Sequence, residues 1–176
     1  MNLTELQPAR EAAFIALGSN LGEPRRFIRE ALACLAAFSD SPILVSSLWR
    51  SSPVDCPPDS PAFLNAVAGM SVRTGETPES LLIKLQALER EFGRRPKVRL
   101  NEPRPLDLDL IAFGAQTRQT AGLILPHPRA CVRKFVLYPL SEIAPELILP
   151  GQTKTILALR NELASSEQVE RFESLY

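Results

Sequence analysis

Sixteen prolines divide this chain into short segments, and their spacing is the feature that most limits its fold. Proline interrupts a helix because it lacks a backbone N–H and clashes with the preceding turn, so an all-helical bundle is excluded. Between the breaks, apolar residues follow either helical spacing or the short runs typical of strands. We therefore predict strands at residues 12–17, 43–50, 63–72 and 106–111, and helices at residues 24–38, 77–92 and 153–163.

The first six predicted elements follow the order strand, helix, strand, strand, helix, strand. This is the order of the ferredoxin-like βαββαβ core, in which helices pack on a mainly antiparallel sheet. The sequence therefore predicts an α+β fold. Residues 51–61 and 94–105 contain several prolines and are long enough to be functional loops that close over substrates.

Composition indicates an ordinary globular chain with no overall charge. We predict a single domain over residues 12–176, preceded by a short polar leader, residues 1–11. Twenty Lys and Arg balance twenty Asp and Glu, so no overall field would attract nucleic acid or an anionic membrane. The cysteines form no CxxC pattern, and no apolar run is long enough to cross a bilayer. We expect a cytoplasmic monomer without nucleic-acid or membrane partners.

Leucine and aspartate alternate in the predicted strand at residues 106–111. Side chains at i and i+2 lie on the same face, so Asp107 and Asp109 lie together while the leucines face the core. Two adjacent carboxylates repel each other unless a cation lies between them. Mg²⁺ suits this position, because it binds one or two carboxylates together with phosphate oxygens and water. A magnesium site and a solvated acidic strand face both fit this short pattern.

A basic segment, residues 90–104, lies immediately before the acidic strand and contains six cations but only two acids. Guanidinium groups bind the outer oxygens of phosphates while metal ions lie between the phosphates, so the position suits phosphoryl transfer. A solvated basic loop is the alternative. The cations are Arg90, Arg94, Arg95, Lys97, Arg99 and Arg104.

Further aromatic and polar side chains suit a flat heterocycle or a phosphate. Phe63 and Asn65 share one strand face and could stack on and hydrogen-bond a planar ring, and Phe135 offers a second aromatic group. His127, the only histidine, lies between prolines and near arginines, where it could donate a hydrogen bond to phosphate. Core packing of the aromatic rings and a structural role for the histidine are the alternatives.

Six motifs follow one another along the chain. They lie at residues 16–22 (ALGSNLG), 46–51 (SSLWRS), 63–67 (FLNAV), 88–94 (LEREFGR), 103–110 (PRPLDLDL) and 125–137, where LPHPR is followed by RKFVL. In this order and spacing they resemble the 6-hydroxymethyl-7,8-dihydropterin pyrophosphokinase family, from about residue 13 to residue 150. The set is far more specific than any one of its members.

The resemblance implies an ATP-dependent pyrophosphokinase of folate biosynthesis. Such an enzyme transfers the diphosphate of ATP to the hydroxymethyl group of 6-hydroxymethyl-7,8-dihydropterin and releases AMP. By this resemblance, Asp107 and Asp109 would bind two Mg²⁺ ions, and the catalytic residues would be Asp107, Asp109, Arg94 and Arg104. The pterin would contact Ser51, Ser52, Val54, Phe63, Asn65 and Phe135. ATP would contact Gln86, Glu89, Arg94, Arg104, His127 and Arg133.

One departure from the family pattern lies before the acidic strand. Many relatives carry Arg-Trp-Gly-Pro-Arg there, whereas this chain has LNEPR at residues 100–104, so the final arginine remains but the first arginine and the tryptophan do not. Our hypothesis is that Arg95, Lys97 or Arg99 supplies the missing cation. The change leaves open a weakly active homologue that serves as a partner protein. The predicted fold also supports RNA-binding modules, although their aromatic-rich segments are missing here.

Overall fold

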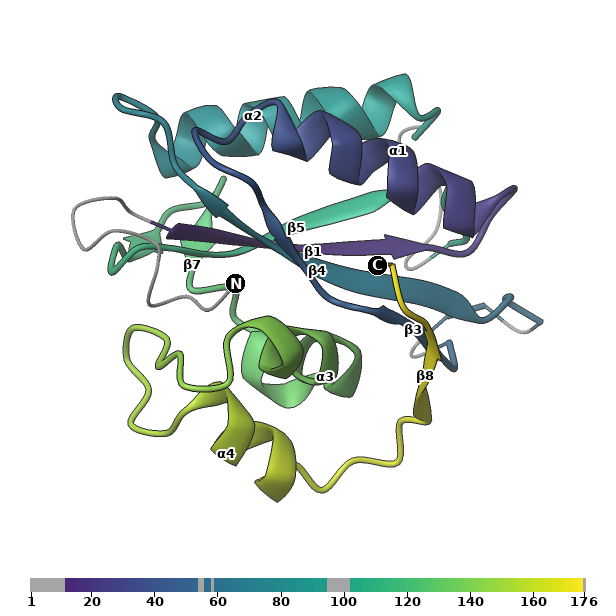
Figure 1. Cartoon of the computed structure of the whole chain (residues 1–176). Coiled ribbons are helices and arrows are strands. Elements are labelled where there is room, and N and C mark those ends of the chain that lie inside the picture. The colour runs from purple at the N-terminus through teal and green to yellow at the C-terminus, as the bar shows by residue number, and fades with distance from the viewer. Residues whose placement is uncertain (1–11, 54–55, 58, 95–101, 176) are drawn as a thin grey trace.

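The computed structural model describes residues 12–53, 56–57, 59–94 and 102–175, which form a β-sheet with helices on both faces (Figure 1). The predicted leader, Val54 and residues 95–101 of the basic segment lie outside these residues. The strands are β1 (Ala12–Ser19), β2 (Leu44–Val45), β3 (Leu48–Ser51), β4 (Phe63–Ser71), β5 (Asp107–Phe113), β6 (Arg118–Gln119), β7 (Ile124–Leu125) and β8 (Val169–Glu173). The helices are α1 (Pro24–Ala36), α2 (Pro78–Glu91), α3 (Lys134–Ile143) and α4 (Ile156–Glu162), with a 3₁₀ turn at Ala130–Val132.

The main sheet is six-stranded and antiparallel, with strand order β5-β1-β4-β3-β8 and β2 beside β4. Apart from β8, this is the order that a ferredoxin-like βαββαβ chain produces, with the first and last strands of the motif adjacent. The predicted α+β fold class and antiparallel sheet are therefore confirmed. The prediction of one domain over residues 12–176 remains a prediction.

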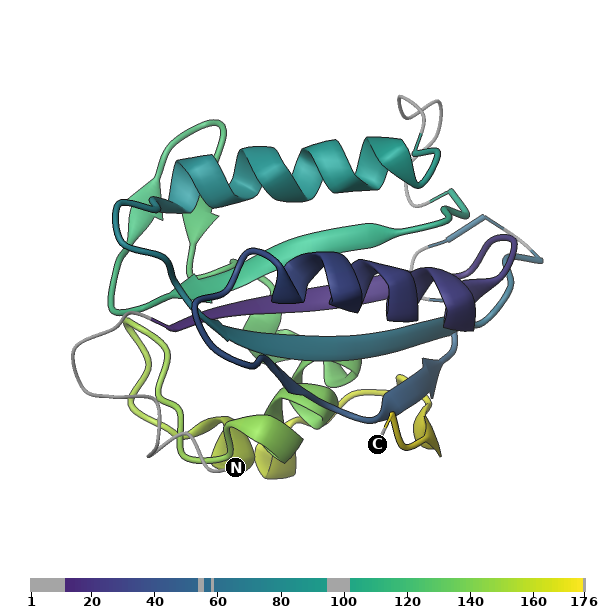
Figure 2. The same cartoon turned by 45° about the horizontal axis from the view of Figure 1, so that its top comes forward.

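Helices α1 and α2 lie side by side on one face of the sheet (Figures 1 and 2). Their apolar residues, such as Leu35 and Leu85, are fully buried with Ile15 and Leu17 of β1 in one cluster. A capping box begins α2: the Thr77 hydroxyl accepts a hydrogen bond from the Ser80 amide at 3.1 Å, and the Ser80 hydroxyl accepts one from the Thr77 amide. The packing of α1 and α2 therefore covers this face of the sheet.

The opposite face carries α3 and α4, which cover only part of it (Figure 1). Val136, Leu137 and Leu140 of α3 pack on Phe14 and Val67 in a second cluster. The helix predicted at residues 153–163 forms as the shorter α4, which Thr155 caps through the Ala158 amide. No helix within the described part of the chain combines the length and apolar character needed to span a bilayer.

Two features of the sheet differ from the predicted elements. The strand expected at residues 43–50 is interrupted at Ser46 and Ser47, because the Ser46 hydroxyl accepts from the Val67 amide at 2.9 Å and the Ser47 amide donates to the Glu142 carboxylate at 2.7 Å. The Ser46 amide still donates to the Val67 carbonyl at 3.0 Å, so these side-chain bonds interrupt the strand locally without separating it from β4. Strand β8, which the sequence analysis missed, pairs with β3 and extends the sheet.

Candidate active site

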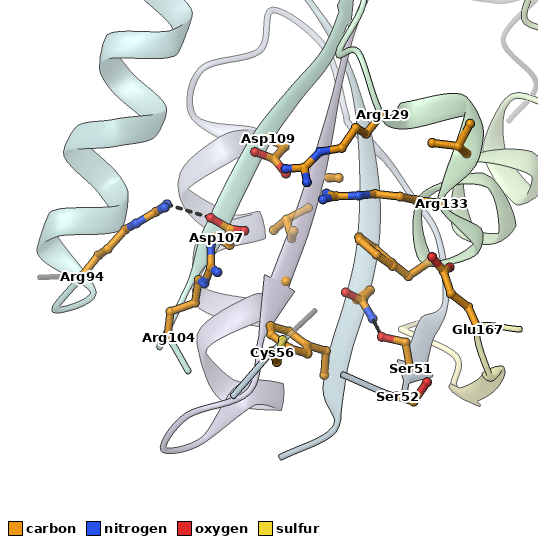
Figure 3. A pocket seen from close by; sticks show the side chains of 17 residues that line it. Ser51, Ser52, Cys56, Arg94, Arg104, Asp107, Asp109, Arg129, Arg133 and Glu167 are labelled. Carbon is orange, nitrogen blue, oxygen red and sulfur yellow. Dashed lines mark hydrogen bonds and ion pairs between the residues drawn. The ribbon is translucent and has the colours of Figure 1, made fainter. Parts of the chain in front are cut away.

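A cavity of about 300 Å³ opens on the α3 face of the sheet, where β1 and β3 end and β4 and β5 begin (Figure 3). The strand register places three of its lining residues in one row, since Gly18 of β1 lies opposite Asp107 of β5 on one side and Asn65 of β4 on the other. Because Gly18 has no side chain, the floor between the carboxylate and the amide stays open. The sheet therefore joins an acidic wall to an aromatic and amide wall.

The acidic wall is formed by Asp107 and Asp109, which both line the cavity. Leu108 and Leu110 are buried on the other face of β5, together with Leu106 just before the strand. The two oxygens of Asp107 accept hydrogen bonds from Arg94 Nη1 at 2.7 Å and from Arg104 Nη1 at 2.9 Å. The two aspartates therefore lie on one face of the strand and the leucines on the other, as predicted.

The surroundings of Asp109, the second carboxylate of the pair, shift its pKa. Burial, followed by the negative charge of Asp107, raises the pKa of Asp109, although His127, Arg133 and Arg104 act in the opposite direction. Burial is the larger cause, and the repulsion between the two adjacent carboxylates adds to it. A divalent cation would remove the repulsion, so the donor set fits Mg²⁺.

The carboxylate pair offers a metal ion only part of its coordination shell. Residues 95–101 lie outside the described ranges, and within those ranges no three His, Cys, Asp or Glu side chains are grouped so as to hold a metal ion. An ion bound at Asp107 and Asp109 would therefore take its remaining ligands from phosphate and water. Mg²⁺ is usually bound in this way in proteins that act on nucleotides.

Glu89, which was predicted to contact ATP, lies beside the acidic wall. Its carboxylate is buried, accepts a hydrogen bond from the Leu108 amide of β5 at 2.8 Å and pairs with Arg94. Burial raises the pKa of Glu89 to about 7, against the opposing effects of the Leu108 bond and Arg94. Gln86 is exposed on α2, and neither residue lines the cavity. Their contacts with ATP remain predictions.

Arginines approach the acidic wall from the segment before α3. Arg133 and Arg129 line the cavity and extend toward Asp109 (Figure 3). His127 is held next to β5 by its amide, which donates to the Ile111 carbonyl at 2.9 Å, and burial lowers the pKa of its imidazole. His127 does not line the cavity itself. Arg129 was not among the predicted site residues, although it belongs to the LPHPR motif.

The other wall carries most of the residues predicted to bind the pterin. Ser51, Ser52, Phe63, Asn65 and Phe135 all line the cavity. The buried Asn65 amide donates to the Ser51 hydroxyl at 2.9 Å, which fixes the orientation of the amide group. Val54 lies outside the described residues.

Besides Arg129, six cavity residues were not among the predicted site residues. Three belong to the recognised ALGSNLG motif, and the others are Cys56, Val132 and Glu167. Cys56 belongs to the predicted loop at residues 51–61, and Val132 lies one residue before the RKFVL segment, so both were near recognised features. Glu167 belongs to none of the six motifs. No local signal in the sequence places it at the site.

Comparison with known proteins identifies the family of this fold and site. The model of the 7,8-dihydro-6-hydroxymethylpterin-pyrophosphokinase (HPPK) family matches residues 14–145. The chain belongs to this family. A Pseudomonas aeruginosa relative named 2-amino-4-hydroxy-6-hydroxymethyldihydropteridine pyrophosphokinase is 43% identical over 141 residues, which cover 80% of this chain and 85% of the relative. A Haemophilus influenzae relative of the same name is 37% identical over 158 residues, covering 89% and 96%.

Some HPPK relatives are much longer than this chain. The folic acid synthesis protein fol1 of Pneumocystis carinii is 41% identical over 140 residues, which are 80% of this chain but 18% of that protein. The crystal structure of wild-type Plasmodium falciparum HPPK-DHPS with pteroate has a TM-score of 0.65 at 14% identity, covering 86% of this chain and 42% of that one. This structural likeness supports the fold alone. None of these findings supports the alternatives, an RNA-binding module or a weakly active partner protein.

Proposed function

We propose that this chain transfers the diphosphate group of ATP to the hydroxymethyl group of 6-hydroxymethyl-7,8-dihydropterin in folate biosynthesis. The hydroxyl oxygen forms a bond to the β-phosphorus, the bond from that phosphorus to the α,β-bridging oxygen breaks, AMP leaves and the hydroxyl proton passes to solvent. One observation carries this proposal: a carboxylate pair surrounded by arginines and a wall of aromatic rings and an amide line the same cavity. Membership of the HPPK family supports it.

Asp107 and Asp109 would hold the metal, for which we propose two Mg²⁺ ions. When bound, Mg²⁺ neutralises phosphate charge and orients the reacting oxygens. Arg94 and Arg104 keep the Asp107 carboxylate in one orientation, and each of its oxygens retains a lone pair for a metal ion. Arg133 extends toward Asp109, where a phosphate chain would meet its positive charge.

The pterin would occupy the wall opposite the metal ligands. Asn65 is buried and fixed by Ser51, so its amide can form hydrogen bonds to the heterocycle without first becoming ordered. Phe63 and Phe135 line the same wall and would stack on the ring. The roles of Ser51, Ser52 and Val54 at the pterin edge, and of Gln86, Glu89 and His127 at ATP, are part of this proposal.

Catalysis in such a site consists mainly of alignment and charge neutralisation. The cavity brings the acceptor alcohol and the phosphate chain together between the two walls. No general base of the chain is required by this arrangement, because the hydroxyl proton can leave to water. We also propose that the protein acts as a cytoplasmic monomer without nucleic-acid or membrane partners. The hypothesis that Arg95, Lys97 or Arg99 compensates for the altered basic segment concerns residues outside the described ranges.

The decisive assay measures AMP in mixtures of the purified protein, ATP, Mg²⁺ and 6-hydroxymethyl-7,8-dihydropterin. We expect AMP and the pterin diphosphate to form in equal amounts, and AMP to be absent when either the pterin or Mg²⁺ is omitted. Release of ADP in place of AMP would contradict diphosphate transfer. Binding of RNA without Mg²⁺, together with no AMP, would favour the RNA-binding alternative.

Gly18 provides a test of the cavity itself. A Cβ atom added at this position would lie 3.4 Å from Asn65 Oδ1 and 4.0 Å from Asp107 Cβ, which are ordinary contacts. Gly18→Ala should therefore keep kcat/KM for the pterin within about threefold of wild type. The larger side chain of Gly18→Leu would enter the cavity and overlap the bound pterin. We expect kcat/KM to fall about a hundredfold, the rate factor typical of a severe steric clash. Equal activity of the two folded variants would show that the pterin binds elsewhere.

A further inference from the structure

A short stretch of the C-terminal tail, residues 165–168, lies along the cavity wall that carries Ser51 and Ser52. It contributes Glu167 to the cavity lining (Figure 3). This stretch precedes β8 and lies beyond residues 14–145, which the family model matches. Its contacts join two parts of the site that are far apart in the sequence.

The carboxylate of Glu167 caps helix α3. The first N–H groups of a helix have no partner within the helix, and a residue just before it usually supplies an acceptor. Arg133 occupies that place in α3, and its side chain makes no capping hydrogen bond. Glu167 Oε2 accepts the Lys134 amide instead, at 2.7 Å. Its negative charge is also favourable at a helix N-terminus.

Lys134 in turn holds the tail. Its ammonium group donates to the Ser165 carbonyl at 2.5 Å and to the Glu167 carbonyl at 3.4 Å. The backbone and the side chain of Lys134 therefore both bind the same stretch. Arg133 and Phe135, the residues on either side of Lys134, line the cavity.

The other end of the stretch binds the end of β3. The Ser52 amide donates to the Gln168 carbonyl at 3.1 Å, and the Gln168 amide donates to the Ser52 hydroxyl at 3.4 Å. The tail thus connects the beginning of α3, which carries Phe135, to the strand end that carries Ser51 and Ser52. Asp107 and Asp109 lie across the cavity on β5 (Figure 3).

We infer that Glu167 is a positioning residue for the pterin: by capping α3, it holds Phe135 at a fixed place relative to the Ser51 wall. The inference rests on the proposed function, because it assigns the pterin to this side of the cavity. Loss of the cap would loosen the first turn of α3 and with it one of the two aromatic groups that would stack on the ring. The metal wall, which depends on β5, would keep its arrangement.

The test compares Glu167→Ala and Glu167→Gln with the matched control Glu170→Ala. Glu170 lies three residues away on β8, is exposed and contacts Arg50 at 3.5 Å. In Glu167→Ala, KM for 6-hydroxymethyl-7,8-dihydropterin should rise about fivefold, which is the change in an equilibrium constant expected from the loss of a typical helix cap. KM for ATP should rise less, by about twofold, because Arg133 at the start of α3 is a proposed ATP contact, whereas Arg94 and Arg104 belong to other elements. For the same reason kcat should change less than about twofold. Glu167→Gln keeps an acceptor oxygen for the Lys134 amide and should restore most of the affinity for the pterin.

Hydrogen exchange at the Lys134 amide reports on the cap independently of activity. It should accelerate in Glu167→Ala and return toward the wild-type rate in Glu167→Gln. An equal effect of Glu170→Ala on KM, or a fall in kcat with both KM values unchanged, would overturn the positioning role. An inactive wild-type protein would contradict the proposed function, whereas an active wild-type protein with an unchanged pterin KM in Glu167→Ala would contradict only the role of Glu167.

Discussion

Replacing Asp109 by asparagine is expected to lower the rate of AMP release by about two to three orders of magnitude. A bound metal ion stabilises the charge of the transition state by several kcal/mol, and losing that stabilisation lowers the rate by about this factor. The amide has nearly the same shape as the carboxylate but lacks its charge, so the cavity should stay intact while its affinity for Mg²⁺ falls. Asp107→Asn should have a comparable effect and should also weaken the contacts with Arg94 and Arg104. The measurement is the steady-state rate as a function of Mg²⁺ concentration.

Two features of this experiment separate metal binding from a general loss of structure. Asp40→Asn changes an aspartate near α1 that pairs with Arg73 at 3.6 Å, far from the cavity lining, and should leave the rate unchanged. A higher Mg²⁺ concentration should recover part of the activity of Asp109→Asn. If Asp109→Asn works at nearly the wild-type rate at low Mg²⁺ concentration, the metal site is not at the carboxylate pair.

The parts of the site that the sequence predicted well are those that depend on local geometry. The side-chain period of a strand is two, so the placement of Asp107 and Asp109 on one face follows from the alternation with leucine alone. The same rule brings Phe63 and Asn65 to one face of β4, and both line the cavity. The fold class followed from the order of the elements, and the strand order of the sheet agrees with it.

The parts that were missed depend on contacts between distant segments. A predicted strand is interrupted at Ser46 and Ser47 by side-chain hydrogen bonds whose partners, Val67 and Glu142, lie on other elements. Glu167 is held at the cavity by a hydrogen bond from the amide of Lys134, 33 residues earlier in the chain. No sequence pattern near Glu167 indicates this contact. Such contacts follow from tertiary packing, which a motif or a local period does not contain.

Gln86 and Glu89 of α2 show the same limit within a single helix. They lie three residues apart, which suggests a shared face. In the structure Gln86 is exposed, whereas Glu89 is 6% exposed and binds the backbone of β5. The carboxylate therefore connects α2 to the strand that carries the metal ligands, a role that helical spacing does not reveal.

Glu89→Ala is accordingly expected to destabilise the protein by about 2 kcal/mol, because it leaves the buried Leu108 amide without an acceptor, whereas Arg94 keeps its contact with Asp107. The free energy of unfolding should be measured by urea denaturation at pH 8, above the pKa of about 7 that burial gives Glu89, so that the wild-type carboxylate is charged. Glu89→Gln is the matched control, since its amide oxygen can still accept from Leu108. Its loss should be about 1 kcal/mol, because burial makes the charged form of Glu89 costly in the wild-type protein. If alanine and glutamine reduce stability equally, the bond to Leu108 contributes little, and the importance of Glu89 lies in its charge toward Arg94.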